Sequence, residues 1–274
     1  MMKNENPRQN RLIVYLRGGL GNQLFQISAG LASAPNSSRS LALSSSLLPL
    51  HQDTLAGISR WPLMVRQLDK LNLRILDSRH QPEGGTSLTS KMLTMVEAAS
   101  RLNPNLSLRF GIVLPETINQ LQGVTLSDAR LISLTMDADL VEIALPEIRN
   151  AFQNLANPSP LFSELKQRSH REMPSIIHVR AGDMETLTSI YGQITKNYWD
   201  LAISSLDGRR PVWLFTDAKE PERKASSLGI APDLIIDASR FKLSPAETLC
   251  LMTTGSSLVG SNSTFSWWAA VIGS

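Results

Sequence analysis

Apolar residues in the second half of the chain form short β-branched runs separated by stretches with helical spacing. The strand-like runs cover residues 175–179, 212–215, 234–236 and 257–260, and the helical stretches cover 196–206 and 245–253. Strands that alternate with helices in this way are typical of a parallel, doubly wound sheet. The pattern therefore predicts an α/β fold for this half.

The first half opens with one clear unit of the same kind. Residues 12–16 read Leu-Ile-Val-Tyr-Leu, a glycine-rich turn follows, and residues 22–34 are compatible with a helix. Residues 37–145 mix Ser-rich and Gly-rich pieces with apolar runs of ambiguous period. We therefore expect a second α/β domain here, without assigning its remaining elements.

A break in helical periodicity marks the boundary between the halves. Apolar residues recur at helical spacing over residues 146–171, interrupted by Asn-Pro-Ser-Pro at 157–160. We place a hinge here and predict two domains, residues 1–155 and 156–274.

Composition and charge narrow the class of protein. The chain has 274 residues with 42% hydrophobic content, enough for two modest cores. Its 27 Lys and Arg against 24 Asp and Glu give a net charge of +3, too small and dispersed for a nucleic-acid partner. The single cysteine, Cys250, and 4 histidines offer little for disulfides or a structural metal site.

The N-terminal segment carries no visible targeting signal. Residues 1–11 are polar, and the apolar run 12–16 is too short to cross a bilayer. We expect a bacterial-type cytoplasmic protein without a signal peptide or transmembrane segment.

Ligands of open α/β sheets bind beyond the carboxyl ends of the strands, so residues just after each strand are the first candidates. After the first strand come Arg17 and Gly18-Gly19-Leu20-Gly21-Asn22-Gln23, where glycines let backbone amides approach a phosphate. An ordinary turn explains the same glycines about as well. Their spacing is not that of the dinucleotide fingerprint.

A second candidate follows the strand at 175–179. His178 and Arg180 alternate onto one side of the chain, and a guanidinium suits a pyrophosphate bidentately. Asp183 could orient either side chain. The alternative is a plain ion pair between Arg180 and Asp183 at a strand end.

A third candidate is Asp217, in Phe215-Thr216-Asp217-Ala218. Its carboxylate could accept from a guanine edge or a ribose. Taken alone, however, Asp217 is better explained as the N-cap of a helix over residues 221–226.

The last candidate is the polar cluster that opens the C-terminal helix, Gly260-Ser261-Asn262-Ser263-Thr264-Phe265-Ser266-Trp267-Trp268-Ala269-Ala270. Hydroxyls and helix-terminal amides there suit phosphate oxygens. The tandem tryptophans fit core packing or a sugar platform, and we expect core packing.

In this order, the segments resemble the motifs of glycosyltransferase family 11, the α-1,2-fucosyltransferases. Residues 18–26 are similar to its opening G-x-x-G-N-Q-x-F-Q, residues 178–183 to its H-x-R-R-G-D, and residues 215–217 to its F-S/T-D-D. Residues 197–203 resemble the aromatic helix after the arginine motif. Residues 251–268, ending in Ser-Asn-Ser-Thr-Phe-Ser-Trp-Trp, match the last motif almost letter for letter.

The resemblance implies a GT-B fold, with two Rossmann-like domains whose parallel sheets face across a cleft. It implies inverting transfer of L-fucose from GDP-β-L-fucose to a galactoside hydroxyl, giving an α-1,2 linkage in a cell-surface glycan. No metal or other cofactor is implied. The partners would be GDP-fucose and a β-galactoside-containing acceptor, with loose peripheral attachment to the inner membrane face.

The resemblance also implies roles for individual residues. Arg180 would hold the β-phosphate with support from His178, and Asp217 would lie near the guanosine. Asp183 is the motif carboxylate and the candidate base. The remaining donor-binding candidates are Asn262, Ser263, Thr264 and Phe265 in the C-terminal domain, and Gly18, Gly19, Gly21 and Asn22 in the other.

The sequence departs from the family pattern at three points. Ala181 replaces the second arginine of its motif, Ala218 replaces the second aspartate, and the sequence ends a few residues after Trp268. Relative to the family, we expect the C-terminal domain to be truncated in this sequence, and we expect these departures to bear on catalytic competence.

Two other functions fit parts of the sequence. Asp137 and Asp139 follow the apolar run 131–136 and imitate the metal-binding D-x-D of GT-A glycosyltransferases. Alternatively, the chain is a catalytically impaired homologue that binds a GDP-sugar or glycan without turnover. Insensitivity to a chelator would exclude the first, and transfer to a β-galactoside would exclude the second.

Overall fold

The computed structural model describes residues 10–16, 18–34, 40–44, 102–103, 112–113, 128–132, 136–182, 192 and 194–274. The chain separates into two compact units, which meet in the sequence between Asn150 and Ala151. Among the described residues, each unit holds a four-stranded sheet in which all the strand pairs are parallel. The predicted α/β fold with parallel sheets is confirmed.

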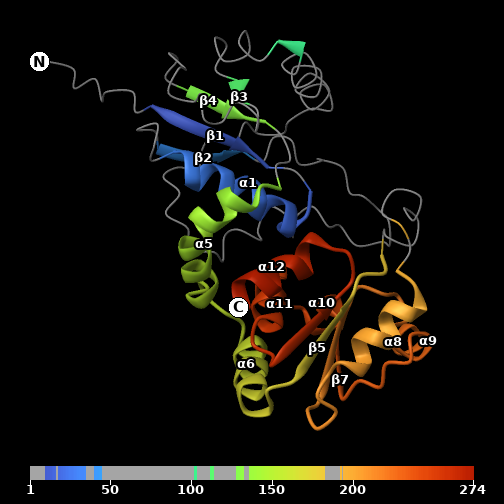
Figure 1. Cartoon of the computed structure of the whole chain (residues 1–274). Coiled ribbons are helices and arrows are strands. Elements are labelled where there is room, and N and C mark those ends of the chain that lie inside the picture. The colour runs from blue at the N-terminus through green and yellow to red at the C-terminus, as the bar shows by residue number, and fades with distance from the viewer. Residues whose placement is uncertain are drawn as a thin grey trace, which may run out of the picture. The chain divides into compact units, whose positions relative to one another are not determined.

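The N-terminal sheet has the strand order β2-β1-β4-β3 (Figure 1). Its strands are β1 Arg11–Tyr15, β2 Ser40–Ser44, β3 Ile112–Val113 and β4 Asp128–Leu131, and helix α1 spans Leu20–Ser33. Strand β1 alternates between buried and half-buried residues. Gly30 brings α1 close to this sheet, because a Cβ there would stand 2.7 Å from side chains of Val14 and Leu41.

Helix α5 Ala138–Gln153 runs through the sequence boundary between the two units. The break predicted at residues 157–160 follows it directly. The next helix, α6 Pro160–Glu172, begins with Ser159 as its N-cap, whose hydroxyl accepts from the amide of Phe162. Proline at the first helical position completes this start signal.

The C-terminal sheet has the order β7-β6-β5-β8. Its strands are β5 Ser175–Val179, β6 Val212–Thr216, β7 Leu234–Ile236 and β8 Ser257–Gly260. The helices after α6 are α8 Lys196–Ser204, α9 Pro221–Ser227, α10 Ala238–Phe241, α11 Pro245–Met252 and α12 Thr264–Gly273. These bounds confirm the alternation of strands and helices expected from the sequence.

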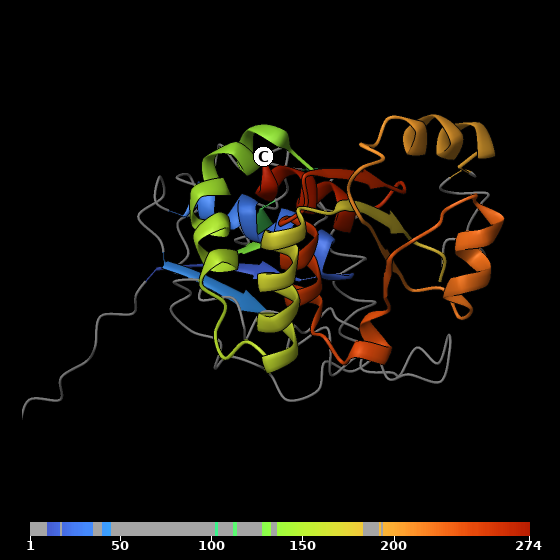
Figure 2. The ribbon, with the colours of Figure 1, turned by 90° about the horizontal axis from the view of Figure 1, so that it is seen from below.

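Helices cover both faces of this sheet (Figures 1 and 2). On one face, Trp199 of α8 and Ala225 of α9 pack against Ile177 and Leu214. The other face carries the alternate strand residues, including Trp213, whose ring lies under the guanidinium of Arg168 from α6. Trp213 is completely buried, so the sheet is the centre of this unit's core.

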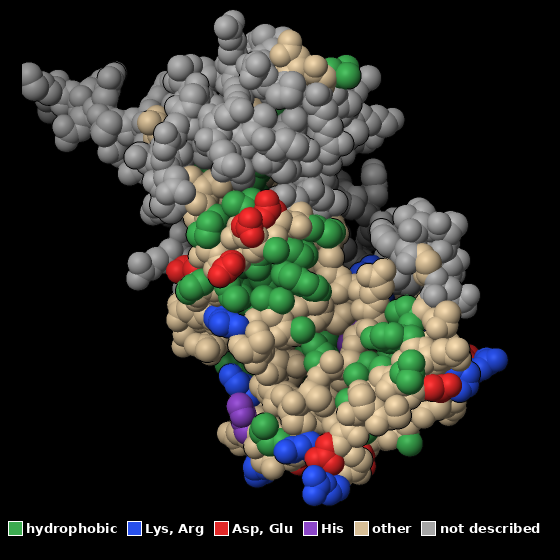
Figure 3. All heavy atoms as spheres, viewed as in Figure 1, with side chains coloured by type: hydrophobic (Ala, Val, Ile, Leu, Met, Phe, Trp, Pro, Cys, Tyr) green, Lys and Arg blue, Asp and Glu red, His purple; other side chains and the backbone are tan. Residues whose placement is uncertain are grey.

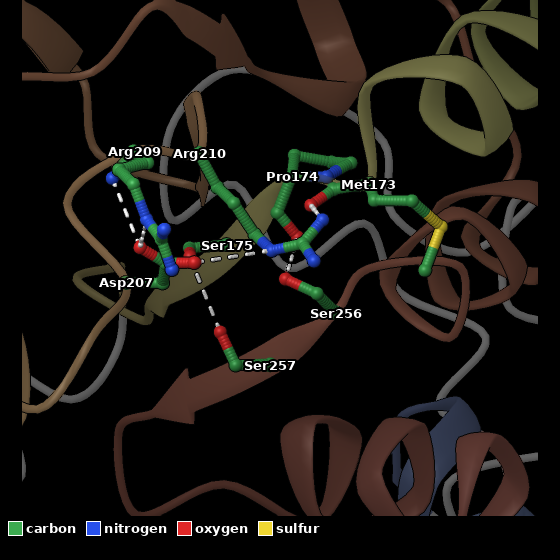
Figure 4. A network of polar contacts seen from close by, with 8 residues as sticks. All are labelled: Met173, Pro174, Ser175, Asp207, Arg209, Arg210, Ser256 and Ser257. Carbon is green, nitrogen blue, oxygen red and sulfur yellow. Dashed lines mark hydrogen bonds and ion pairs between the residues drawn. The ribbon is translucent and has the colours of Figure 1, made fainter.

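The amino-terminal edge of the sheet is held by polar contacts (Figure 4). Asp207 pairs with Arg209 and Arg210, and Arg210 donates to the carbonyl of Met173 at 3.2 Å. The hydroxyl of Ser257 donates to that of Ser175 at 3.2 Å and so ties β8 to β5. This edge is opposite the one at which a ligand is expected.

Charge on the visible face of the described residues is mixed, with Lys and Arg interspersed among Asp and Glu (Figure 3). In the described part of the chain, no helix combines the length and apolar character needed to cross a bilayer.

Candidate functional site

Strands β5, β6 and β8 end at one edge of the C-terminal sheet, because all three run parallel. His178 lies within β5, opposite Phe215 on one side and Gly260 on the other. Arg180 follows at the end of that strand. The structure therefore brings together three of the segments that the sequence singled out separately.

Ser261 connects the ends of β5 and β8. Its amide donates to the carbonyl of His178 at 2.9 Å, and its hydroxyl donates to the same carbonyl at 3.3 Å. The hydroxyl also accepts from the amide of Arg180 at 2.9 Å. Ser261 is buried, so it fixes the backbone on which Arg180 stands. In the sequence, Ser261 is part of a motif, but the motif does not indicate its structural role. Its position between the end of a strand and the N-cap of a helix is the one feature from which a role in holding the strand end could have been inferred.

Asp217 has a different role from the helix cap that its sequence position favours. Its Oδ1 accepts from the amides of Ala181 at 2.7 Å and Gly182 at 3.2 Å, across from β6 to the end of β5. The N-cap of α9 is Glu220, whose side chain makes no cap hydrogen bond. The capping interpretation is therefore wrong, and the carboxylate instead holds the segment that follows Arg180.

His178 is an uncharged group in this site. Burial lowers its pKa from 6.5 to about 4, an effect opposed by the charge of Asp217 and reinforced by that of Arg180. Its Nδ1 is buried and has no hydrogen-bond partner within the described residues. Its ring centroid lies 5.8 Å from that of Phe265, so helix α12 closes one side of the histidine.

The start of α12 is organised by two serines. The hydroxyl of Ser263, the N-cap, accepts from the amide of Phe265 at 3.2 Å. The buried hydroxyl of Ser266 donates to the carbonyl of Ser261 at 2.9 Å and contacts that of Ser263 at 3.1 Å. These hydrogen bonds hold the turn that contains Asn262, Ser263 and Thr264, which lies at the same edge of the sheet as Arg180.

The tandem tryptophans divide between core and surface. Trp268 is completely buried, as expected, whereas the side chain of Trp267 is 39% exposed. Helical geometry explains the difference, because adjacent helix residues face directions about 100° apart. The expectation that both rings serve the core is therefore wrong for Trp267.

Tyr198 also contacts this edge, from helix α8. Its hydroxyl donates to the carbonyl of Gly260 at 2.6 Å, while its neighbour Trp199 is buried under the sheet. The sequence placed both on an aromatic helix but did not indicate which would reach the strand ends.

The glycine turn of the N-terminal unit has the local geometry expected of it. Gly18 has φ +72°, a left-handed conformation that favours glycine, and Gly19 is the N-cap of α1. Gln23 is fully buried, and its side-chain amide donates to the carbonyl of Gly18 at 2.8 Å. Gly21 and Asn22 lie in the first turn of the helix. Asp183 and Arg17, also singled out in the sequence, lie outside the described residues.

Asp137 is used as a helix cap. Its Oδ1 accepts from the amides of Asp139 at 2.9 Å and Leu140 at 3.3 Å, at the start of α5. The preceding strand, β4, ends at Leu131, before most of the apolar run assigned to a strand. Within the described residues, no group of three His, Cys, Asp or Glu side chains could hold a metal ion. The D-x-D interpretation is therefore wrong in placing the two carboxylates directly after a strand, because Asp137 caps helix α5.

Comparison with known proteins places the fold. No family model matches the sequence, and no curated protein does so. Among solved structures, the chain is similar to the fucosyltransferase NodZ from Bradyrhizobium, with a TM-score of 0.53 and 14% identity over 95% of this chain and 92% of NodZ. It is also similar to FUT1 of Arabidopsis thaliana in complex with GDP, with a TM-score of 0.50 and 12% identity over 98% and 70% of the two chains.

A third similar structure is POFUT1, with a TM-score of 0.50 and 13% identity over 96% of this chain and 94% of that protein. All three solved structures are fucosyltransferases. The chain therefore has the GT-B fold of these enzymes, as the motifs implied, and the alternative GT-A assignment is wrong.

Proposed function

We propose that the protein is an inverting fucosyltransferase that moves L-fucose from GDP-β-L-fucose to a hydroxyl of a galactoside. The observation that carries the proposal is the edge of the C-terminal sheet, where Ser261 and Asp217 hold the backbone around Arg180 beside the uncharged His178. The fold supports it, because FUT1 of similar structure was solved with GDP.

Arg180 would provide the main electrostatic contribution. When the bond between fucose and GDP breaks, negative charge develops on the leaving phosphate, and a preorganised guanidinium stabilises it without a metal. Asn262, Ser263, Thr264 and Phe265, all in the C-terminal unit, would complete the donor pocket. His178 would act in its neutral form, because burial opposes its protonation.

The finer assignments rest on the sequence motifs. We propose an α-1,2 linkage to a β-galactoside in a cell-surface glycan, with Asp183 as the base that takes the proton of the acceptor hydroxyl. Asp217 would position the backbone after Arg180 through Oδ1, which accepts from two amides, while its other oxygen would face the guanosine. We further propose action in the cytoplasm, at the inner face of the membrane.

The direct test is transfer itself. We incubate the protein with GDP-fucose and a β-galactoside and look by mass spectrometry for one deoxyhexose added to the acceptor, with and without a chelator. We expect chelator-insensitive transfer by the wild type. Arg180→Ala should lower kcat by at least about 100-fold, as expected for loss of a group that stabilises transition-state charge.

Arg209→Ala is the matched control. Arg209 lies at the opposite edge of the sheet and is 91% exposed, so its loss should leave transfer unchanged (Figure 4). Near-normal turnover by Arg180→Ala would refute the site. Tight GDP binding without any transfer would instead identify a catalytically impaired homologue, a result that the replacement of motif residues by Ala181 and Ala218 would then explain.

A further inference from the structure

A small cavity lies between strand β8 and helix α12, and the Asn262-Ser263 turn forms part of its lining. Its volume is about 260 Å³, and its lining includes Leu258, Gly260, Asn262, Ser263, Trp267 and Ala270. Neither Arg180 nor Phe265 contributes to its walls. The cavity is thus a neighbour of the proposed donor pocket and shares only its turn.

Trp267 is the largest side chain of this cavity, and its ring packs against that of the next residue, Trp268. Its ring meets that of the buried Trp268 edge-on, with centroids 5.2 Å apart and planes at 89°. Because Trp268 is completely buried, it provides a fixed support for its exposed neighbour. Trp267 therefore offers a preorganised aromatic surface.

The rim beside Trp267 is also rigid. A Cβ at Gly260 would stand 2.7 Å from the Cβ of Ser266, so strand and helix approach each other as closely as glycine allows. The hydroxyl of Ser266 points to the carbonyl of Ser261 within the same turn. A ligand entering the cavity would not have to order these groups, which lowers the entropic cost of binding.

The size and chemistry of the cavity define a ligand class. Its volume of about 260 Å³ is below the roughly 300–1,000 Å³ of sites for drug-sized molecules and is sufficient for one sugar ring. An indole face attracts the weakly positive C–H groups on one side of a pyranose. The Ser263 hydroxyl accepts from the amide of Phe265 and keeps its own proton to donate to a ring hydroxyl.

We propose that this cavity is a pyranose-binding subsite with Trp267 as its platform. The inference deepens the proposed function and rests on it for its biological role, since a fucosyltransferase handles two sugars beside one turn. Two sources share the chemistry: the galactoside of the acceptor and the fucosyl group of the donor.

Ligand-observed NMR tests the subsite without requiring turnover. Saturation transfer from the full-length protein to methyl β-galactoside and, separately, to L-fucose reports which sugar binds. We expect one of them to bind the wild type. Trp267→Leu should weaken that binding by about 10-fold, whereas Trp267→Phe should restore most of it, because the aromatic face is what matters.

Two further measurements separate the possible failures. Leu201→Ala removes another exposed apolar side chain, on α8, and should bind the sugar as the wild type does. Calorimetry with GDP reports the donor pocket and should give the same affinity for Trp267→Leu and wild type. Equal sugar binding by Trp267→Leu and wild type, or no sugar binding by the wild type, overturns the subsite. Absence of GDP binding by the wild type would count against the proposed function instead.

Discussion

A single hydroxyl, that of Ser261, contacts the carbonyl of His178 and the amide of Arg180. From the next strand, Asp217 accepts from the amides of the two residues after Arg180. The backbone on both sides of the arginine is therefore fixed by groups from other strands. A fixed backbone at Arg180 reduces the rearrangement needed to bring its guanidinium to a charged leaving group, which favours electrostatic catalysis.

At the scale of single residues, we predict that His178 makes stability fall in acid. Its pKa is about 4 in the folded protein against 6.5 as the unperturbed value. Above pH 6.5 the group is neutral in both states; between 6.5 and about 4 the unfolded chain takes up a proton that the folded chain does not. The free energy of unfolding should therefore drop by about 3 kcal/mol over this window.

Urea unfolding at pH 8 and pH 4.5, for wild type and His178→Phe, measures this effect. The variant should lack about 3 kcal/mol of the acid-induced loss. His170→Phe, on the exposed side of α6, is the histidine control and should keep the wild-type loss. An equal loss in wild type and His178→Phe would show that burial of His178 does not govern the response.

At the scale of elements, one carboxylate caps two helices. Glu247, in the first turn of α11, accepts from the amide and the hydroxyl of its N-cap Ser244, both at 2.8 Å. Its other oxygen accepts from the amide of Ser159, the N-cap of α6, at 2.7 Å. The side chain is buried, so its removal would leave two amides without an acceptor.

We predict that Glu247→Ala destabilises the C-terminal unit by about 3 kcal/mol, the cost expected for losing hydrogen bonds to a buried charged acceptor. Glu247→Gln retains one acceptor oxygen and should cost less. Glu222→Ala removes an exposed carboxylate from α9 and should change the stability far less than Glu247→Ala does. Urea unfolding followed by the fluorescence of the buried Trp199, Trp213 and Trp268 reports on this unit. Equal stabilities for the Glu247 and Glu222 variants would contradict the double cap.

Elements differ in how far the sequence determines them. The caps of α6 and α11 could be predicted because Ser followed by Pro is a local signal. The role of Asp217 could not, because its partners are amides 35 and 36 residues earlier in the chain. The same holds for Tyr198, whose bond to Gly260 spans 62 residues. Sequence identified the residues at the strand ends, but only pairing of the strands decides which of them meet.

At the scale of the whole molecule, the two halves were not equally predictable. The C-terminal strands are continuous apolar runs, as expected for strands covered on both faces, and β5 is buried at every position. In the N-terminal unit, β3 has two residues and β4 reads Asp-Ala-Arg-Leu, which carry no distinctive period. Their place in the sheet depends on strand pairing, of β4 with β1 and of β3 with β4.

Cys250 is the single cysteine of the sequence and lies in the C-terminal unit. Its reaction with a thiol reagent therefore reports on local unfolding of this unit alone. Burial raises the pKa of its thiol, and its Sγ donates to the carbonyl of Phe152. We predict that a thiol reagent reacts with the native protein at least about 100-fold more slowly than with protein unfolded in urea. If GDP binds this unit, saturating GDP should slow the reaction further.

Moving the thiol provides the control. Cys250→Ala combined with Ser204→Cys places it at the exposed end of α8, where the native protein should react as fast as the unfolded chain. Rapid labelling of native Cys250 would show that this unit opens far more readily than its packing implies.

The strand order β7-β6-β5-β8 has a consequence for biosynthesis. Strand β8 is the last strand of the sheet to leave the ribosome, yet its partner is β5, the first. Until β8 is made, Arg180 lacks the hydroxyl of Ser261, which lies 81 residues later in the chain. A nascent chain can thus build most of this sheet while having no finished pocket, and the capacity to hold a donor would arrive only once β8 and Ser261 have been made.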